Sequence, residues 1–284
     1  MTFDGHIHFF DIASQGKGGL QTWSPNTIKV RMVLNYKGIK YTESFLAYPD
    51  IRPFCASFGI PDDISSERPT LPVIIHYDSH GNVVKALGNS FDIARYLDEL
   101  SPERPVFGQP GGPYAAAAYA IQAALAPFKD RVWSSGAKLA VSKIPAILQP
   151  RCAAWFIEDR TRKHPRGLPP SEWPSKDGEV EWKIYEEGLS YLATLLGGST
   201  TAPRVGEAAR TQPFLLGDTP VYADFIVAGI FTWTKRASED DFQRLLRVTK
   251  DTGELERHYQ ACEPWILAQG KVVEWDVENK CIAA

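Results

Sequence analysis

The chain has 284 residues, of which 44% are hydrophobic and 23% are charged, so it can form one or two globular domains with a substantial core. Its formal net charge of −3 argues against a surface for nucleic acid or anionic membranes. Four scattered cysteines form no C-x-x-C pair, and no apolar run is long enough to span a membrane. We therefore expect a cytoplasmic protein with reduced thiols and no metal site.

The N-terminal stretch predicts a strand, a glycine-rich loop and a helix. Alternation at residues 6–11 indicates the strand, and apolar residues recur at helical spacing from Val30. Ser24 followed by Pro25 is typical of a helix N-cap and a first-turn proline. A serine at this place suits the stabilisation of an anion, because free N–H groups and the helix dipole point at it. The alternative is that Ser24 serves only as a cap.

The following residues predict a small mixed sheet. The expected elements are a strand at 40–47, a short helix with loops at 48–66, a strand at 68–77, a hairpin turn at 78–82, a strand at 83–87 and a helix from Asn89. Asn89 can cap that helix, with Asp92 at its third position. The order β-α-β-α-β-β-α indicates helices packed on a mixed sheet.

The second part of the sequence predicts helices alone. A proline- and glycine-rich linker at 106–112 separates a domain at 1–105 from a domain at 113–284. Helices are expected at 114–141, 144–163, 179–196, 239–250 and 254–268, with loops at 164–178 and 197–212. The stretch at 214–224 leads into a further apolar helix, which ends at Trp233 or Lys235. No strand pattern follows residue 113. The last four residues formally fit a prenylation box, but the stretch before them is acidic, which disfavours a lipid anchor.

These features, in this order, resemble cytosolic glutathione transferases over nearly the whole chain. Five short motifs are similar to the fungal etherase-related class and, more distantly, to bacterial glutathione-dependent β-etherases; they lie at 24–31, 35–39, 48–51, 70–74 and 216–225. The resemblance implies a thioredoxin-like α/β N-terminal domain with a glutathione site and an all-α C-terminal domain. It also implies glutathione as co-substrate, a homodimer, and a role in detoxification of aromatic compounds.

Under this resemblance, Ser24 is the catalytic residue. The thiolate, and not the thiol, of glutathione is the nucleophile. A hydroxyl donor beside a helix N-terminus can lower a thiol pKa from about 8.5 to about 6 or 7. Ser24 would therefore stabilise the thiolate without itself attacking. No cysteine stands near position 24, which disfavours the chemistry of cysteine-bearing relatives.

The same resemblance assigns Asn26, Leu71, Pro72, Asn89 and Ser90 to glutathione binding. It implies a cis Pro72, which frees the Leu71 backbone to pair with the cysteinyl unit like a strand. The residue pattern alone favours a trans proline at the start of an edge strand. Asn89 and Ser90 would hold the γ-glutamyl end at a helix N-terminus. Many relatives have an acidic residue where Asn89 stands, which predicts weaker affinity.

Aromatic side chains are the candidates for an electrophile pocket, which we expect between the domains. Aromatic substrates favour apolar, stackable surroundings, although for each single candidate a place in the core is the more common role. The candidates are Trp23, Tyr48, Tyr119, Phe128 and Trp133. Two basic residues of the first helix, Lys29 and Arg31, are two positions apart and do not share a face, so neither has an assigned role.

Asp224 matches the buried aspartate of the family's later capping box. That box usually begins with Ser, Thr or Asn, where this chain has Val221. Either Thr219 takes over as the cap or the local network is rearranged. We expect a structural role for Asp224.

Three functions remain open from the sequence. The first is a glutathione transferase that attacks small aromatic electrophiles, by conjugation or by opening an ester or aryl ether. The second is a non-catalytic carrier that sequesters phenolic ligands. The third is a relative that keeps the fold for regulation, against which Ser24 and the Asn89–Ser90 pair argue.

Overall fold

The computed structural model describes residues 4–63, 68–109, 112–197, 211–276 and 281–282. Contacts between Cα atoms divide the chain into two compact units. The first contains Met1–Val106, Leu148–Trp155 and Pro264–Ala284, and the second contains Phe107–Ile147 and Phe156–Glu263. The expected loop at 197–212 and the end of the prenylation box lie mostly outside the described residues.

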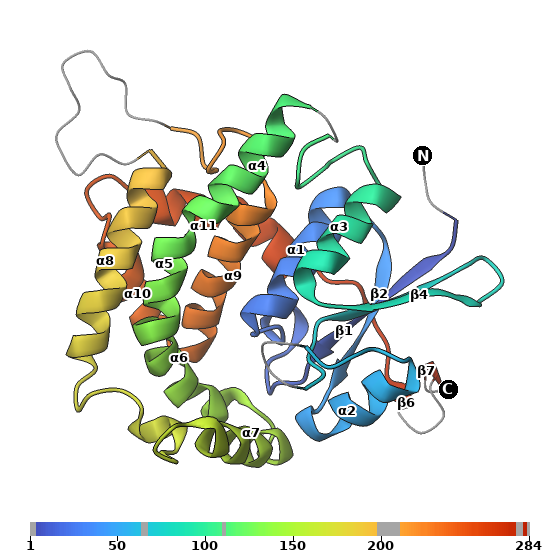
Figure 1. Ribbon diagram of the computed structural model, residues 1–284, viewed down its shortest axis with the longest axis horizontal. Helices are drawn as coiled ribbons and strands as arrows, with labels where there is room; N and C mark the ends of the chain where they lie inside the picture. Colours follow the sequence, from blue (N-terminus) through green and yellow to red (C-terminus); the bar gives the residue numbers. More distant parts are fainter. Residues whose placement is uncertain (1–3, 64–67, 110–111, 198–210, 277–280, 283–284) are drawn as a thin grey trace. The chain divides into compact units, whose positions relative to one another are not determined.

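The first unit has the predicted thioredoxin-like α/β architecture. Its elements are β1 (His6–Ile12), α1 (Pro25–Lys37), β2 (Tyr41–Leu46), α2 (Tyr48–Ser57), β3 (Val73–Tyr77), β4 (Val83–Gly88) and α3 (Ser90–Leu100). The sheet has the strand order β4-β3-β1-β2-β5, with β1 parallel to β2 and antiparallel to β3. Figure 1 shows α1 and α3 side by side above the strands and α2 below them.

The central strand β1 is buried along almost its whole length. Successive side chains point to opposite sides of the sheet, so both of its faces are covered. Phe9 lies on the α1 side, with the Arg31 guanidinium 5.7 Å from its ring centroid. Phe10 points to the other side, where its ring centroid is 4.3 Å from that of Phe54 on α2. This strand therefore holds both helical layers on the sheet.

The expectation of no strand after residue 113 was wrong. Lys271–Val272 forms β5, which pairs in parallel with β2 through Thr42 and Glu43. Two further short strands, β6 (Trp275–Asp276) and β7 (Cys281–Ile282), pair with each other. A two-residue strand is too short to show alternation, so the sequence pattern could not reveal it.

The second unit is built from helices. They are α4 (Pro113–Ala124), α5 (Ala126–Arg131), α6 (Ala137–Lys143), α7 (Pro150–Lys163), α8 (Glu179–Leu195), α9 (Tyr222–Ala237), α10 (Glu239–Arg247) and α11 (Glu254–Leu267). The first residues of α7, up to Trp155, and the last residues of α11, from Pro264, belong to the first unit. Helix α9 is the most deeply buried and packs against α4, α6 and α10.

The long helices expected at 114–141 and 144–163 are interrupted. The first divides at Leu125, next to Pro127, and again at a π-helical turn at Val132–Gly136. Pro150 begins α7, because proline suits a first turn and breaks a helix interior. At the π-helical turn, a Cβ on Gly136 would lie 3.1 Å from the Tyr185 ring, so glycine permits the close approach of α8.

Asp224 has the structural role that its sequence context predicted. Its Oδ2 accepts a hydrogen bond from the backbone N–H of Val221, the N-cap residue of α9, at 2.8 Å. Its Oδ1 accepts from the Leu215 N–H at 2.8 Å and lies 3.2 Å from Nε2 of His258. The network is therefore rearranged around the aspartate, and Val221 keeps the cap position without a side-chain acceptor.

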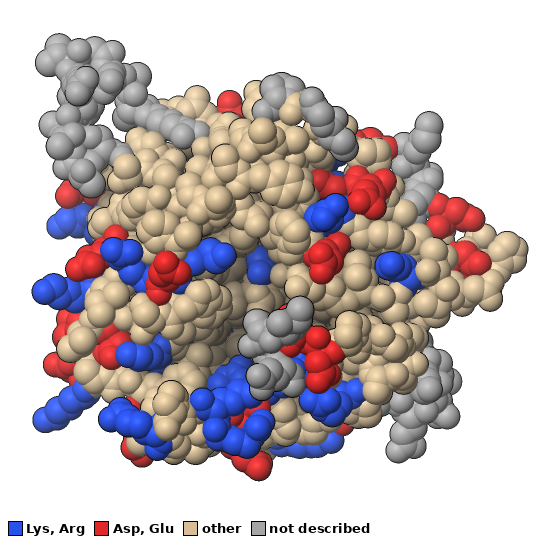
Figure 2. Space-filling model, viewed as in Figure 1, with Lys and Arg blue, Asp and Glu red and all other residues tan. Residues whose placement is uncertain are grey.

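Basic side chains gather over α7 on the face shown in Figure 2. The last turn of this helix carries Arg160, Arg162 and Lys163 around the buried carboxylate of Asp159, at 2.7, 3.0 and 3.8 Å. Cations at a helix C-terminus are favoured by the helix dipole.

No helix among the described residues is long and apolar enough to cross a membrane.

A buried histidine is built into the α2 face of the sheet. His8 contacts Thr42 Oγ1 through Nδ1 at 2.6 Å and Ser44 Oγ through Nε2 at 3.0 Å. Its ring centroid is 5.3 Å from that of Trp275 in β6. Burial, assisted by the neighbouring His6, lowers the pKa of His8 to about 3, so the ring is neutral at physiological pH.

This histidine predicts a loss of stability in acid. The unfolded chain binds a proton at His8 near pH 6.5, whereas the folded chain does so only near pH 3. Stability is therefore full above pH 6.5 and falls by about 1.4 kcal/mol per pH unit below it. Urea unfolding between pH 7 and pH 4 should show a shallower decline for His8→Gln than for the wild type. The exposed His80→Gln variant controls for the loss of a histidine, and equal slopes for His8→Gln and wild type would contradict the assignment.

Candidate functional site

Ser24 occupies the N-cap position of α1, as the sequence predicted, but its hydroxyl does not cap the helix. The backbone there is extended, with φ −71° and ψ 130°, and no N–H group of the helix donates to the side chain. Among the residues that the structure describes, only the carbonyl of Ser24 is engaged, by Ile28 N–H at 3.0 Å and Thr27 Oγ1 at 3.2 Å. The residue is 6% exposed, so its hydroxyl lies in a nearly dry place beside the positive end of the helix.

The loop before Ser24 is fixed by side-chain hydrogen bonds. Ser14 Oγ donates to the Gln21 carbonyl at 2.7 Å and accepts from the Gly16 N–H at 3.2 Å. Thr22 Oγ1 donates to Asp11 Oδ2 at 2.7 Å. The loop is therefore tied to its own stem and to β1.

Asp11 belongs to a fully buried ionic cluster that the sequence did not reveal. Arg31 Nη2 lies 3.5 Å from Asp11 Oδ2 and 2.5 Å from Glu43 Oε2, and all three side chains are completely inaccessible. Burial raises the pKa of the Glu43 carboxyl, and the adjacent guanidinium opposes that rise. Arg31 Nη1 also donates to the Ala268 carbonyl at 3.3 Å, which ties the C-terminal segment to α1.

The Leu71–Pro72 peptide bond is cis, which confirms the expectation drawn from the resemblance. Leu71 is 3% exposed and directly precedes β3. Within the described parts of the chain, neither its backbone N–H nor its carbonyl has a hydrogen-bond partner. A buried, unpaired backbone at the start of a strand is available to pair with an extended ligand.

Asn89 caps α3, and Ser90 is the first residue of that helix. Asn89 Oδ1 accepts from the Phe91 N–H at 2.9 Å, and the residue has a positive φ of 67°. It lines a cavity of about 480 Å³ together with Thr70, which precedes Leu71, and with Gly88 at the end of β4. Three carboxylates line the same cavity, those of Asp62, Asp63 and Asp92. Asn26 is exposed in the first turn of α1.

Two of the predicted aromatic residues meet next to Ser24. The ring centroids of Trp23 and Tyr48 are 6.4 Å apart, and both side chains are more than nine-tenths buried. Tyr48 stacks on Trp155 at 4.8 Å with an interplanar angle of 9°, and the Arg68 guanidinium lies 4.7 Å from the Trp155 ring centroid. Trp155 and Arg68 were missed in the sequence analysis, because both are distant from Tyr48 along the chain and no local pattern connects these residues.

The other predicted aromatic residues lie in the helical unit. Tyr119 is 45% exposed and stacks on Phe107 at 5.6 Å. Trp133, in the π-helical turn, is 51% exposed and lies 5.9 Å from Trp233. Phe128 is completely buried, as the core alternative describes, and its contact with a substrate stays a prediction.

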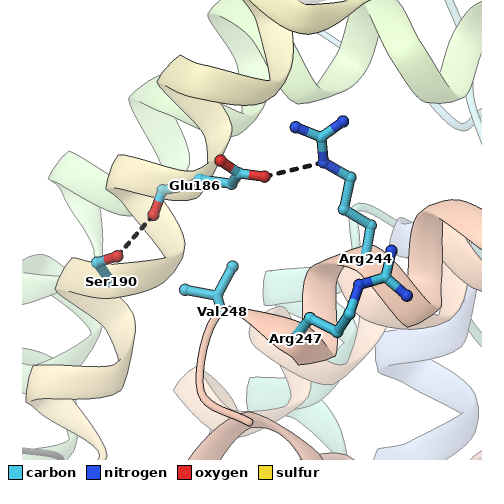
Figure 3. A pocket seen from close by; sticks show the side chains of 5 residues that line it. All are labelled: Glu186, Ser190, Arg244, Arg247 and Val248. Carbon is cyan, nitrogen blue, oxygen red and sulfur yellow. Dashed lines mark hydrogen bonds and ion pairs between the residues drawn. The ribbon is translucent and has the colours of Figure 1, made fainter.

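A second cavity of about 480 Å³ lies between α8 and α10. Figure 3 shows Arg244 reaching Glu186 across it, at 2.9 Å from Nε to Oε1. The two Nη atoms of Arg244 pair with Glu179 at 2.5 and 2.9 Å. The guanidinium is thus paired with two carboxylates. None of the predicted site residues lines this cavity.

The three cysteines whose side chains the structure describes are not activated. Cys55, Cys152 and Cys262 are buried, and burial raises the pKa of each, that of Cys55 to about 12. A raised pKa removes the thiolate that nucleophilic chemistry requires. Within the described residues, no group of three or more His, Cys, Asp or Glu could hold a metal ion.

A thioredoxin-like unit with a cis proline before its third strand, in one chain with a helical unit, is the architecture of glutathione transferases. The sequence profile of the glutathione S-transferase N-terminal domain matches residues 23–100, and that of the C-terminal domain matches residues 120–265. The chain belongs to the glutathione S-transferase family.

Individual relatives agree with this assignment. The chain is 33% identical over 281 residues to the glutathione S-transferase-like protein ustS of Aspergillus flavus, covering 97% of this chain and 96% of the relative. It resembles the crystal structure of glutathione S-transferase CsGST63524 of Ceriporiopsis subvermispora in complex with glutathione, with a TM-score of 0.73 and 28% identity over 92% of this chain and 97% of that one. The similarity to glutathione transferase GSTFuA3 from Phanerochaete chrysosporium gives a TM-score of 0.71, 26% identity and coverage of 92% and 97%.

The positive φ at Asn89 predicts an unequal response to two substitutions. Asn89→Ala removes the cap. It also places at φ 67° an alanine, whose side chain cannot make a hydrogen bond that offsets the backbone strain, so we expect a loss of about 1–3 kcal/mol in unfolding free energy. Asn89→Gly also removes the cap but adopts this φ freely, so its loss should be a few tenths of a kcal/mol. Urea unfolding of both variants measures the difference. Equal losses would mean that the backbone conformation does not constrain this position.

Proposed function

We propose that this glutathione S-transferase is of the serine type, with Ser24 stabilising the thiolate of bound glutathione. The observation that carries the proposal is the buried hydroxyl of Ser24 at the N-terminus of α1, which no N–H group of that helix engages. A serine used only as a cap would accept from the second or third residue of the helix. This hydroxyl is instead available to donate to a ligand.

The chemistry follows from the position of that hydroxyl. A hydrogen bond donated to sulfur is stronger when sulfur is ionised, so it lowers the thiol pKa. First-turn N–H groups and the helix dipole act in the same direction. Low exposure at Ser24 limits competition from water, which increases the effect of both. The thiolate, its proton released to solvent, would then attack an electrophilic carbon. A C–S bond forms, the bond from that carbon to chloride or to the oxygen of an ester or aryl ether breaks, and the leaving group departs with the electron pair.

Glutathione would extend from Ser24 along the first unit. Its cysteinyl backbone would pair with the unpaired backbone of Leu71, before the cis Pro72. Its γ-glutamyl end would lie at the N-terminus of α3, held by Asn89 and Ser90. Asn89 already accepts from Phe91 N–H, and its side-chain amide retains two N–H donors for a ligand carboxylate. We also assign Asn26 to this site.

The co-substrate of the thiolate is proposed to be a small aromatic electrophile. Trp23 follows the loop and directly precedes Ser24, and its contact with Tyr48 continues into the Trp155 stack. Such a row of rings presents apolar faces to a planar substrate. Tyr119 and Trp133, which are partly exposed in the helical unit, remain proposed contacts. Conjugation and the opening of an ester or aryl ether are both consistent with this chemistry, and the etherase-related class and a role in detoxification are part of the proposal.

The second candidate function is a carrier that sequesters phenolic ligands without turnover. The aromatic row favours it as much as it favours catalysis, because stacking alone can retain a phenol. The carrier does not require a free serine hydroxyl, and this difference separates the two functions. Homodimer formation and a cytoplasmic location are proposed on family likeness.

Ser24→Ala is the test of the serine mechanism. The ultraviolet absorbance of bound thiolate, recorded against pH, should give an apparent pKa well below about 8.5 in the wild type and a value higher by about one to two units in the variant. The turnover of an activated aryl chloride should fall about 10²-fold. Binding of glutathione itself, measured by calorimetry, should change little because its other contacts remain.

The matched control is Ser14→Ala, which removes a loop hydroxyl whose partners are the Gln21 carbonyl and the Gly16 N–H. It separates loss of a hydroxyl near the loop from loss of the thiolate donor. A wild-type protein that binds glutathione with an unshifted thiol pKa would contradict the proposed mechanism and support the carrier.

A further inference from the structure

One carboxylate oxygen of β1 holds the segment that leads to Ser24. Asp11 Oδ2 accepts the hydrogen bond of Thr22 Oγ1 at 2.7 Å, and both residues are 0% exposed. The other oxygen, Oδ1, accepts from the backbone N–H of Ile12 at 2.6 Å. A hydrogen bond to an ionised acceptor in a dry environment is shorter and stronger than a neutral one. Thr22 is therefore firmly bound to the sheet.

The same oxygen is linked to the helix that Ser24 begins. Asp11 Oδ2 is 3.5 Å from Nη2 of Arg31, which lies two turns into α1 and is itself paired with Glu43. One atom of β1 thus connects Thr22, which lies three residues before the first residue of the helix, with a residue in the middle of the helix. This geometry fixes the helix N-terminus relative to the sheet from both sides.

Ser24 lacks any tie of its own side chain to the helix, because its hydroxyl accepts no N–H group there. Its position is therefore set by the backbone of residues 22–24. Trp23 packs near Tyr48, and Thr22, two residues before Ser24, is held by its hydrogen bond to Asp11. A shift of about 1 Å in a catalytic donor is enough to cost a large factor in rate.

We propose that Thr22 and Asp11 are positioning residues for Ser24, holding its hydroxyl at the N-terminus of α1 where the glutathione sulfur binds. This inference rests on the proposed serine mechanism. In this proposal Thr22 acts through the place of the Ser24 hydroxyl and not by contact with glutathione or the electrophile.

The test is Thr22→Val, which keeps the shape of the side chain and removes the donor. The apparent pKa of bound glutathione thiol should rise by about 0.5 to 1 unit, and kcat/KM at pH 6.5 should fall about three- to tenfold. Thr22→Ser, which restores the hydroxyl, should return both values to within about twofold of the wild type. The dissociation constant of glutathione should change less than about threefold.

The matched control is Thr232→Val. Thr232 is also 0% exposed, and its hydroxyl donates at 2.8 Å to the Ala228 carbonyl within α9 of the other unit. This variant controls for the general cost of removing a buried threonine hydroxyl and should leave the thiol pKa unchanged. Thermal unfolding of all variants shows whether any loss of activity merely follows stability.

A double-mutant cycle with Ser24→Ala decides whether Thr22 acts through Ser24. In the Ser24→Ala background, Thr22→Val should cause no further rise of the thiol pKa. A rise that persists there, or a Thr22→Val variant that loses stability but keeps the wild-type thiol pKa, overturns the inference while the serine mechanism stands. A wild-type thiol pKa in Ser24→Ala itself would instead remove the proposed function, and the inference with it.

Discussion

The buried pairing of Arg31 with Glu43 and Asp11 is the interaction on which the first unit depends. All three side chains are inaccessible, so their desolvation is costly, and truncating one partner would leave charge uncompensated at a cost of about 3–5 kcal/mol. An apolar cluster of the same size could provide equal stability. What the ionic cluster adds is a fixed orientation of the helix, because a guanidinium donates hydrogen bonds only along its N–H bonds. It orients α1 on β1 and β2 at once.

The same cluster explains why the C-terminal segment belongs to the sheet. Arg31 donates to the Ala268 carbonyl, and β5 then pairs with β2 alongside Glu43. Three residues beyond β5, Trp275 packs its ring 4.9 Å from Phe10 on the opposite face. The segment therefore contacts both layers of the first unit. β5 covers the part of the β2 edge at Thr42 and Glu43, which protects that part of the sheet from pairing with another chain.

The sequence predicted those features that rest on local periodicity or on a family motif. The β-α-β-α-β-β-α order, the cap at Asn89 and the cis Pro72 followed from such signals. Long-range pairings did not. Arg31 was given no role because helical spacing describes only neighbours on its own helix, whereas its partners lie on two strands. Trp155 is far from Tyr48 in sequence, and β5 is too short to alternate.

The hydroxyl of Ser24, which does not cap its own helix, connects the fold with the proposed chemistry. An N-cap serine that bonds its own helix contributes about 1 kcal/mol of stability, and this chain does without that contribution at Ser24. The helix start is compensated from outside, by Pro25 in the first turn and by the Thr22–Asp11 bond before it. Stability supplied by the neighbours leaves the hydroxyl available for a ligand. In the proposed serine mechanism, the Ser24 hydroxyl must be held in place without using its hydrogen bond on its own helix, and the bond between Thr22 and the buried carboxylate of Asp11 supplies such support from outside the helix.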